Sequence, residues 1–266
     1  MYVVAPAQLP AGPEPTATQT PTDQQFSSAF RTWVRETTRR VLLAKDLQSY
    51  RSQASRRLRV ADTPFTRVQA ELDRQDEAFR AAHLPPNIAQ GDALERLLCD
   101  TVKSEKAALA ILIKIGLTRA GPPNPVPRLC KLIAHVYAAF HPDFQWQADH
   151  QIHSDKQVTP GAKIQICYIR FMANLNRINQ NHRTLNRQKL FWDDIDEDLA
   201  RLRRKSSAYG VAYSQLIFNL DQATWTGEKT VNDVEEAAQQ VPPHKEVQSR
   251  AATLVEEPNE EVALEE

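Results

Sequence analysis

Apolar residues along the chain recur at intervals of three and four, the spacing that gathers them on one face of an α-helix. Thr63-Pro64 and Thr159-Pro160 mark helix starts, because a capping threonine followed by proline suits a first helical turn. No segment of adequate length alternates apolar and polar residues as a half-buried strand does. The apolar stripes predict seven helices, over about 24–41, 64–84, 92–113, 128–140, 160–180, 190–205 and 207–222.

These stripes predict an all-α fold, an irregular helical bundle of about seven helices, over residues 26–226. The loop at 121–127 contains four prolines, and we expect a hinge there between two subdomains. Glycine accounts for only 7 of the 266 residues, well below an average usage of roughly 7%. The composition therefore disfavours folds that depend on many tight turns or on a Gly-rich phosphate-binding loop.

The two ends of the chain differ from the body in composition. Residues 1–25 are rich in proline and threonine, and residues 227–266 are rich in glutamate, so neither stretch offers enough apolar surface to offset chain entropy. Both are predicted to be disordered arms. Residues 231–266 hold ten acids against two bases, whereas the whole chain holds 33 of each. The tail is therefore acidic, and the remaining chain carries a net charge of +8.

The sequence also indicates a compartment. Its first residues lack the basic start and apolar run of a secretory signal, and no stretch reaches the roughly 20 apolar residues that span a bilayer. Cys99, Cys130 and Cys167 are widely spaced and each follows Leu or Ile, which predicts buried free thiols in a reducing environment. We expect an intracellular protein of the cytoplasm or nucleus that does not enter membranes.

Two stretches are basic enough to attract nucleic-acid phosphates. Residues 27–60 hold nine bases against two acids, and residues 163–192 hold six bases and no acid. In the second stretch, Arg and Asn side chains recur at helical spacing opposite the apolar stripe, and their forked donors suit the reading of base edges. The alternative is a polar face that is solvated or meets acidic residues of the protein. The candidate nucleic-acid-binding residues are Arg31, Arg35, Arg39, Arg170, Asn174, Arg177 and Asn181.

Metal and catalytic chemistry are not favoured. Residues 130–153 gather five side chains of zinc-ligand types, but at a spacing that matches no established zinc motif. These are Cys130, His135, His141, His150 and His153. The acids at 193–198 begin a predicted helix that ends in bases, an order that stabilises the helix dipole without a Mg²⁺ ion. No P-loop, G-x-S-x-G or H-E-x-x-H motif is present, so we expect no catalytic residue, metal or cofactor.

One tripeptide carries a family resemblance. His141-Pro142-Asp143 follows the predicted helix that ends at Phe140, and in this it resembles the loop of J-domain cochaperones that stimulates a chaperone ATPase. Those domains carry a basic face on the preceding helix, where this chain has Arg128 and Lys131. The resemblance implies a J-domain-like cochaperone as one alternative function.

By elimination, the sequence favours a non-enzymatic helical binding or scaffold protein that engages partner proteins. The main alternative is a nucleic-acid-binding protein that uses the basic stretches at 27–60 and 163–192. In that case the tethered acidic tail would compete for the basic surface as a polyanion. The two functions differ in salt dependence, because phosphate binding weakens steeply as salt rises.

Overall fold

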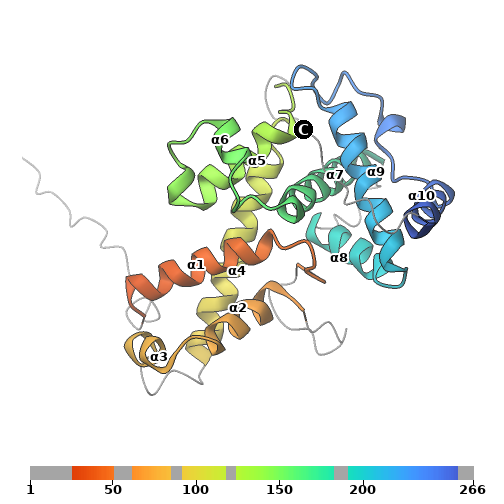
Figure 1. Cartoon of the computed structure of the whole chain (residues 1–266). Helices are drawn as coiled ribbons and strands as arrows, with labels where there is room; N and C mark the ends of the chain where they lie inside the picture. The colour runs from red at the N-terminus through yellow and green to blue at the C-terminus, as the bar shows by residue number, and fades with distance from the viewer. Residues whose placement is uncertain (1–25, 51–61, 85–91, 118–123, 183–190, 257–266) are drawn as a thin grey trace, which may run out of the picture.

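A computed structural model describes residues 26–50, 62–84, 92–117, 124–182 and 191–256 of the chain. Within these ranges the structure is all-α and has no strand, so the predicted fold class is confirmed (Figure 1). These ranges hold ten α-helices rather than the seven predicted. They are α1 (Ser28–Leu42), α2 (Pro64–Asp73), α3 (Glu77–His83), α4 (Asp92–Ile113), α5 (Leu129–Phe140), α6 (Asp149–His153), α7 (Pro160–His182), α8 (Phe191–Leu202), α9 (Ser207–Thr224) and α10 (His244–Glu256), with short 3₁₀ helices η2 (Pro142–Phe144) and η3 (Glu236–Gln239).

The three additional helices have local causes. The stripe predicted as one helix over 64–84 is divided into α2 and α3, because a carboxylate oxygen of Asp76 accepts a hydrogen bond from the backbone N–H of Phe79 (2.6 Å) and caps a new helix. α6 has only five residues and lies in the loop between two predicted helices. α10 lies in the segment predicted as a disordered tail.

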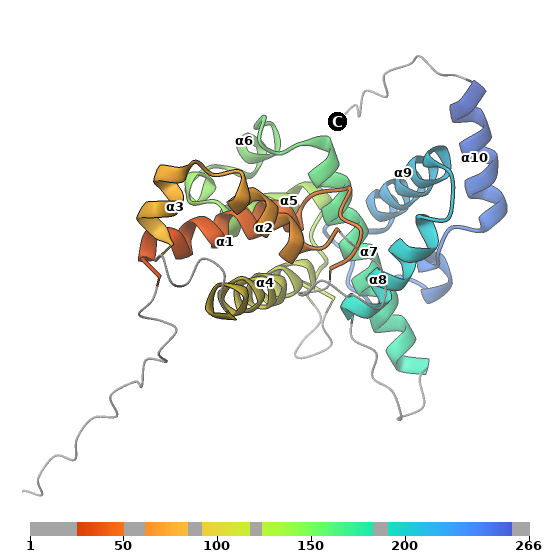
Figure 2. The same ribbon diagram turned by 90° about the horizontal axis from the view of Figure 1, so that it is seen from below.

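The N-terminal helices pack around α4. Helices α1 and α2 contact each other and both contact α4, while α3 lies at the end of this layer that is remote from α10 (Figures 1 and 2). There the rings of Phe30, Trp33 and Phe79 stack or tilt against one another, with centroids 5.3–6.4 Å apart. This ring cluster holds α3, which has no fully buried residue of its own.

The long helix α7 is the centre of the molecule. It contacts α4 and α5 as well as α8, α9 and η3, and Figure 2 shows it between these two groups. Residues 165–176 are all buried, as expected for a helix surrounded on every side rather than one that buries a single stripe. The polar residues of α7 therefore need internal partners. Among the helices that the structure describes, none combines the length and apolar character needed to cross a bilayer.

The C-terminal segment corrects the prediction of a disordered tail from residue 227. Residues 227–256 belong to the fold, since Val231, Val247 and Ala251 are buried and α10 packs along α9 (Figure 1). Val247 and Ala251 are one helical turn apart, so α10 carries an apolar stripe despite its glutamates. The acid-rich average composition concealed this stripe. Residues 1–25 and 257–266, the rest of the predicted arms, lie outside the described residues.

The described part of the predicted hinge, residues 124–127, is anchored. The backbone N–H of Val126 donates to the carbonyl oxygen of Lys229 (2.8 Å), and the carbonyl oxygen of Pro127 accepts a hydrogen bond from the guanidinium of Arg170 (2.6 Å). Residues 118–123 lie outside the described ranges. These two bonds hold the end of the loop against α7 and against the segment that follows α9.

Candidate functional site

Trp146 is the most exposed large apolar side chain in the described part of the chain, with 89% of its surface accessible. It lies in the turn between η2 and α6. A tryptophan is highly buried on average, because its ring system carries about 150–250 Å² of surface that is costly to leave in water. Tryptophan is also the residue most enriched among those that dominate protein interfaces. The turn is therefore a candidate docking site.

Neighbouring residues hold this turn on both sides. Phe144 before it is buried, with its ring edge-on to Tyr137 at a centroid distance of 5.7 Å, and Ile152 after it is buried in α6. Within the turn, the backbone N–H of Gln147 donates to the carbonyl oxygen of Phe144 (3.1 Å), and the side-chain amide of Gln147 donates to the carbonyl oxygen of Asp143 (3.0 Å). The exposed indole is thus carried on a backbone that is fixed before any partner binds.

The sequence around Trp146 is acidic. Residues 142–155 contain three aspartates and no Lys or Arg. Of these aspartates, Asp143 and Asp149 are exposed on either side of Trp146 in the sequence. A surface that covers the indole would therefore meet negative charge at the rim of the contact.

His141 supports the turn from inside. It caps the C-terminal end of α5, and its half-buried ring stacks on Tyr137 (centroids 5.3 Å) and lies edge-on to Phe144 (5.9 Å). Burial lowers the pKa of His141, and the positive charge of Arg39 lowers it further. Burial also raises the pKa of Tyr137 to about 12. In the tripeptide that resembles the cochaperone loop, Asp143 is thus exposed while the imidazole packs inward.

Three of the candidate nucleic-acid-binding residues lie on α1. Arg39 donates to the carboxylate of Glu105 on α4 (2.7 Å) and to the carbonyl oxygen of Phe140 (2.9 Å). Arg35 is exposed, with its Nε 3.5 Å from the same carboxylate. Arg31 donates to a backbone carbonyl near the start of α1. Since Glu105 is buried, the charges of Arg35 and Arg39 serve first to neutralise it and join α1 to α4.

The candidates on α7 do not share an open face. Arg170 is completely buried and forms a two-bond ion pair with Asp221 of α9, in which Nε lies 2.8 Å from Oδ1. Its remaining terminal nitrogen donates to the carbonyl oxygen of Pro127. The prediction of an open polar face is therefore wrong at Arg170, because α9 covers that face. The alternative stated from the sequence, a polar face that meets acidic residues of the protein, describes this position.

Asn174, one turn further along α7, is buried as well. Its amide nitrogen donates to the side-chain oxygen of Gln239 in η3, and its oxygen accepts from Nε of Arg177 (3.0 Å). Arg177 is half-buried. The side chain of Asn181 lies outside what the structure describes. The predicted open face is thus wrong at Asn174 too, because η3 covers it.

The predicted cysteine and histidine cluster does not converge. Among the side chains that the structure describes, which include all five of these residues, no three His, Cys, Asp or Glu lie close enough to share a metal ion. Cys99 and Cys167 are buried as predicted, whereas Cys130 is exposed. The prediction of a buried thiol is wrong at Cys130, because this residue lies on the solvent side of α5 although it follows the buried Leu129.

Two acids of α8, Asp196 and Asp198, form hydrogen bonds with other parts of the fold. Asp196 is buried and accepts a hydrogen bond from the backbone N–H of Tyr50 (2.5 Å). Asp198 accepts hydrogen bonds from the hydroxyl of Tyr168 (3.0 Å) and from Arg201 (2.6 Å). Both carboxylates are therefore occupied in holding α8 to the rest of the fold.

Two base-rich ranges lie outside the described residues. Residues 51–61 hold four bases and residues 183–190 hold three, with no acid in either range. Tyr50 directly precedes the first range, Trp192 comes two residues after the second, and their rings stack with centroids 4.9 Å apart. Lys106 lies over the ring of Trp192 at 5.1 Å and donates to the carbonyl oxygen of Tyr50. The described residues next to one end of each range therefore lie at the same place in the fold.

Sequence reasoning did not select Trp146 as a site. The only signal was a tryptophan between Gln145 and Gln147, outside every apolar stripe.

Comparison with known proteins identifies no relative. No protein-family model matches this chain, and no curated protein or solved structure matches it.

Proposed function

We propose that the protein is a non-enzymatic helical scaffold that engages a partner protein through the turn carrying Trp146. The observation that supports this function is the 89% exposure of an indole on a hydrogen-bonded turn. At about 25 cal/mol per Å² of apolar surface, burying a side chain of roughly 200 Å² contributes up to about 5 kcal/mol. Because the turn is already ordered, little of that free energy is lost to fixing its backbone on binding.

The surroundings of the indole specify the chemistry of the partner. An apolar pocket of the partner receives the indole, and Lys or Arg side chains at its rim face Asp143 and Asp149. Truncation of a central interface tryptophan typically costs about 2 kcal/mol or more, which is roughly a 30-fold loss of affinity.

A photo-crosslinking experiment tests this function. The substitution Trp146→p-benzoylphenylalanine in the full chain should capture one partner on irradiation in cells, and the same residue at position 111 serves as the control. Ile111 is also highly exposed, at 73%, but lies on α4. With the purified partner, Trp146→Ala should weaken binding about 30-fold, whereas Ile111→Ala should leave the affinity unchanged. Equal affinity of Trp146→Ala and the wild type would refute the proposed surface.

Nucleic-acid binding is the second candidate function, supported by the contact between Tyr50 and Trp192, each of which lies next to or near one end of a base-rich range in the sequence. Random-sequence DNA or RNA should then shift the protein at low salt, and the affinity should fall steeply with salt. A chain ending at residue 256 keeps α10 and should bind more tightly, because it lacks five acids of the tail.

The cochaperone alternative makes a different prediction. The substitution Asp143→Asn should then abolish stimulation of a chaperone ATPase.

A further inference from the structure

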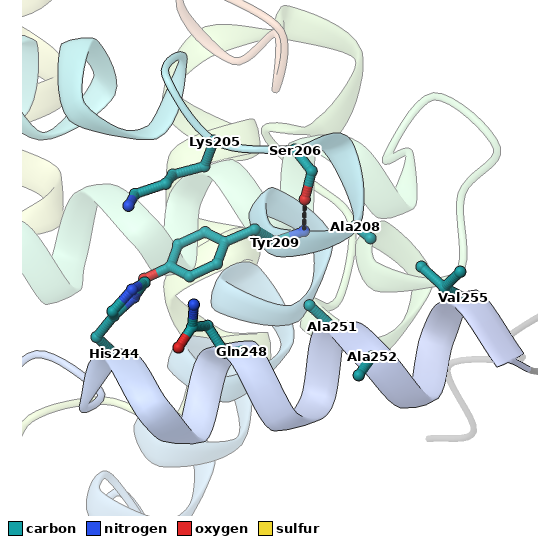
Figure 3. A pocket seen from close by; sticks show the side chains of 9 residues that line it. All are labelled: Lys205, Ser206, Ala208, Tyr209, His244, Gln248, Ala251, Ala252 and Val255. Atoms are coloured by element: carbon teal, nitrogen blue, oxygen red, sulfur yellow. Dashed lines mark hydrogen bonds between the residues drawn. The ribbon is translucent and has the colours of Figure 1, made fainter.

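A groove of about 350 Å³ lies between the start of α9 and the inner side of α10 (Figure 3). Its two ends differ in chemistry. At one end, Lys205 and His244 approach the hydroxyl end of Tyr209, while the other end is formed by alanines and Val255 (Figure 3). The groove therefore suits an extended peptide that is acidic at one end and apolar next to it.

The basic end is preorganised. The hydroxyl of Tyr209 lies 3.0 Å from Nδ1 of His244, and the ammonium group of Lys205 lies 5.6 Å from the centroid of the Tyr209 ring. Lys205 and its neighbour Arg204 are exposed, and so is Lys245 next to His244. One acid, Glu246, adjoins them in the sequence. The net charge at this end of the groove is positive and attracts carboxylates.

The apolar end is open to solvent in the described part of the chain. Val255 is 65% exposed and Ala252 is exposed, although Ala251 beneath them is buried against α9. These residues are the last turn of α10, so the chain leaves the helix directly beside the groove. Residues 257–266 follow with the sequence Glu-Pro-Asn-Glu-Glu-Val-Ala-Leu-Glu-Glu.

We propose that residues 257–266 fold back at Pro258-Asn259 and occupy the groove between α9 and α10. The order of side chains matches the order of the two ends: Val262-Ala263-Leu264 cover the alanines, and Glu265-Glu266 then reach Lys205 and His244. This occupant is independent of the Trp146 turn.

The distances allow this arrangement. Eight residues of extended chain span about 26 Å at roughly 3.3 Å per residue. The path back along α10, eleven residues at about 1.5 Å each, needs only about 16 Å. A short tether holds an attached peptide at an effective concentration in the millimolar range, so even a weak peptide occupies the groove when it is part of the same chain.

A competition experiment with a fluorescent peptide of residues 257–266 tests the proposal. The peptide should bind the chain that ends at residue 256, and should bind the full chain at least about tenfold more weakly, because the tethered copy competes. Leu264→Asp in the full chain should release the groove and restore binding of the peptide. In the shortened chain, Lys205→Glu should weaken binding about tenfold, while Lys103→Glu on the remote helix α4 should not.

Three results would overturn the proposal. The first is failure of the peptide to bind the shortened chain while circular dichroism shows its helicity intact. The second is equal binding of the peptide to the full and shortened chains. The third is dimerisation of the full chain that Leu264→Asp abolishes, since the groove would then hold the tail of a second copy. Carbodiimide coupling between Lys205 and Glu265 or Glu266 at low protein concentration would support the intramolecular arrangement.

Discussion

Single residues in this protein show how burial changes the role of a charge. The guanidinium of Arg170 has three protein acceptors and no exposed surface, so it acts as a link between α7, α9 and residue 127. A buried ion pair gains little over an apolar pair of the same size, but an unpaired buried charge is very costly. The value of the pair is therefore seen only when one partner is removed.

The first prediction concerns this pair. Arg170→Met should lower the free energy of unfolding by about 3–5 kcal/mol, because Asp221 is left buried without its partner. The double variant Arg170→Met/Asp221→Leu should recover most of that loss, since both charges are gone. Urea denaturation of the two single variants and the double variant measures the coupling. Additive losses in the double variant would contradict the interpretation.

The second prediction concerns His141, whose pKa in the fold is lowered by burial below its ordinary value of about 6.5. Above a pH of about 6.5 the imidazole is neutral in both the folded and the unfolded chain, so the lowered pKa does not reduce the free energy of unfolding. As pH falls below this value, the unfolded chain takes up a proton that the fold resists, so stability is lost until the pH passes the folded-state pKa. His141→Gln should therefore show a shallower loss of unfolding free energy between pH 7 and pH 5. An unchanged slope in this variant would exclude the effect.

At the scale of helices, two glycines mark opposite situations. Gly116 follows α4 with a φ of 77°, and a Cβ there would lie 2.8 Å from the Cα of Val126. It allows the chain to leave α4 and pass close to residues 124–127. Gly210 lies within α9, where an added Cβ would meet nothing within 4 Å. One glycine is required by its surroundings, and the other only weakens its helix.

The third prediction compares alanine at these two positions. Gly116→Ala should destabilise the protein by about 2 kcal/mol or more, because it combines a strained backbone with a clash against backbone atoms. Gly210→Ala should stabilise it by about 0.5–1 kcal/mol through helix propensity. Thermal unfolding followed by circular dichroism gives both signs. Two changes of the same sign would show that the surroundings of one glycine differ from this description.

At the scale of the whole molecule, α7 joins α4 and α5 on one side to α8 and α9 on the other. The segment after α9 packs on the remaining side of α7 through η3. Gln239 in η3 pairs with the buried Asn174 of α7, and Lys229 pairs through its backbone with Val126. The C-terminal segment is therefore part of the core architecture rather than an appendage. This changes where the chain can be shortened.

The fourth prediction follows from that architecture. A chain that ends at residue 226 loses η3 and α10, which exposes the side of α9 that packs on Val247 and Ala251. It also leaves the side-chain amide nitrogen of Asn174 without its acceptor, Gln239. It should be less stable by several kcal/mol and prone to aggregate. A chain that ends at residue 256 keeps η3 and α10 and should lose only the contribution of the bound tail, about 1.4 kcal/mol for a tenfold competition. Denaturation midpoints and size-exclusion profiles of the two chains provide the comparison.

Local patterns in the sequence determined the all-α class and most helix positions, because apolar spacing, threonine caps and proline breaks act within one or two turns. The same patterns could not show what lies opposite each polar face. The sequence predicted that Arg170 and Asn174 face solvent, but α9 and η3 cover them. Their partners, Asp221 and Gln239, are 51 and 65 residues away in the sequence. Likewise, the exposure of Trp146 depends on the helices around its turn. Contacts between distant segments decide such burial, and a periodicity records only that one face of a helix is apolar.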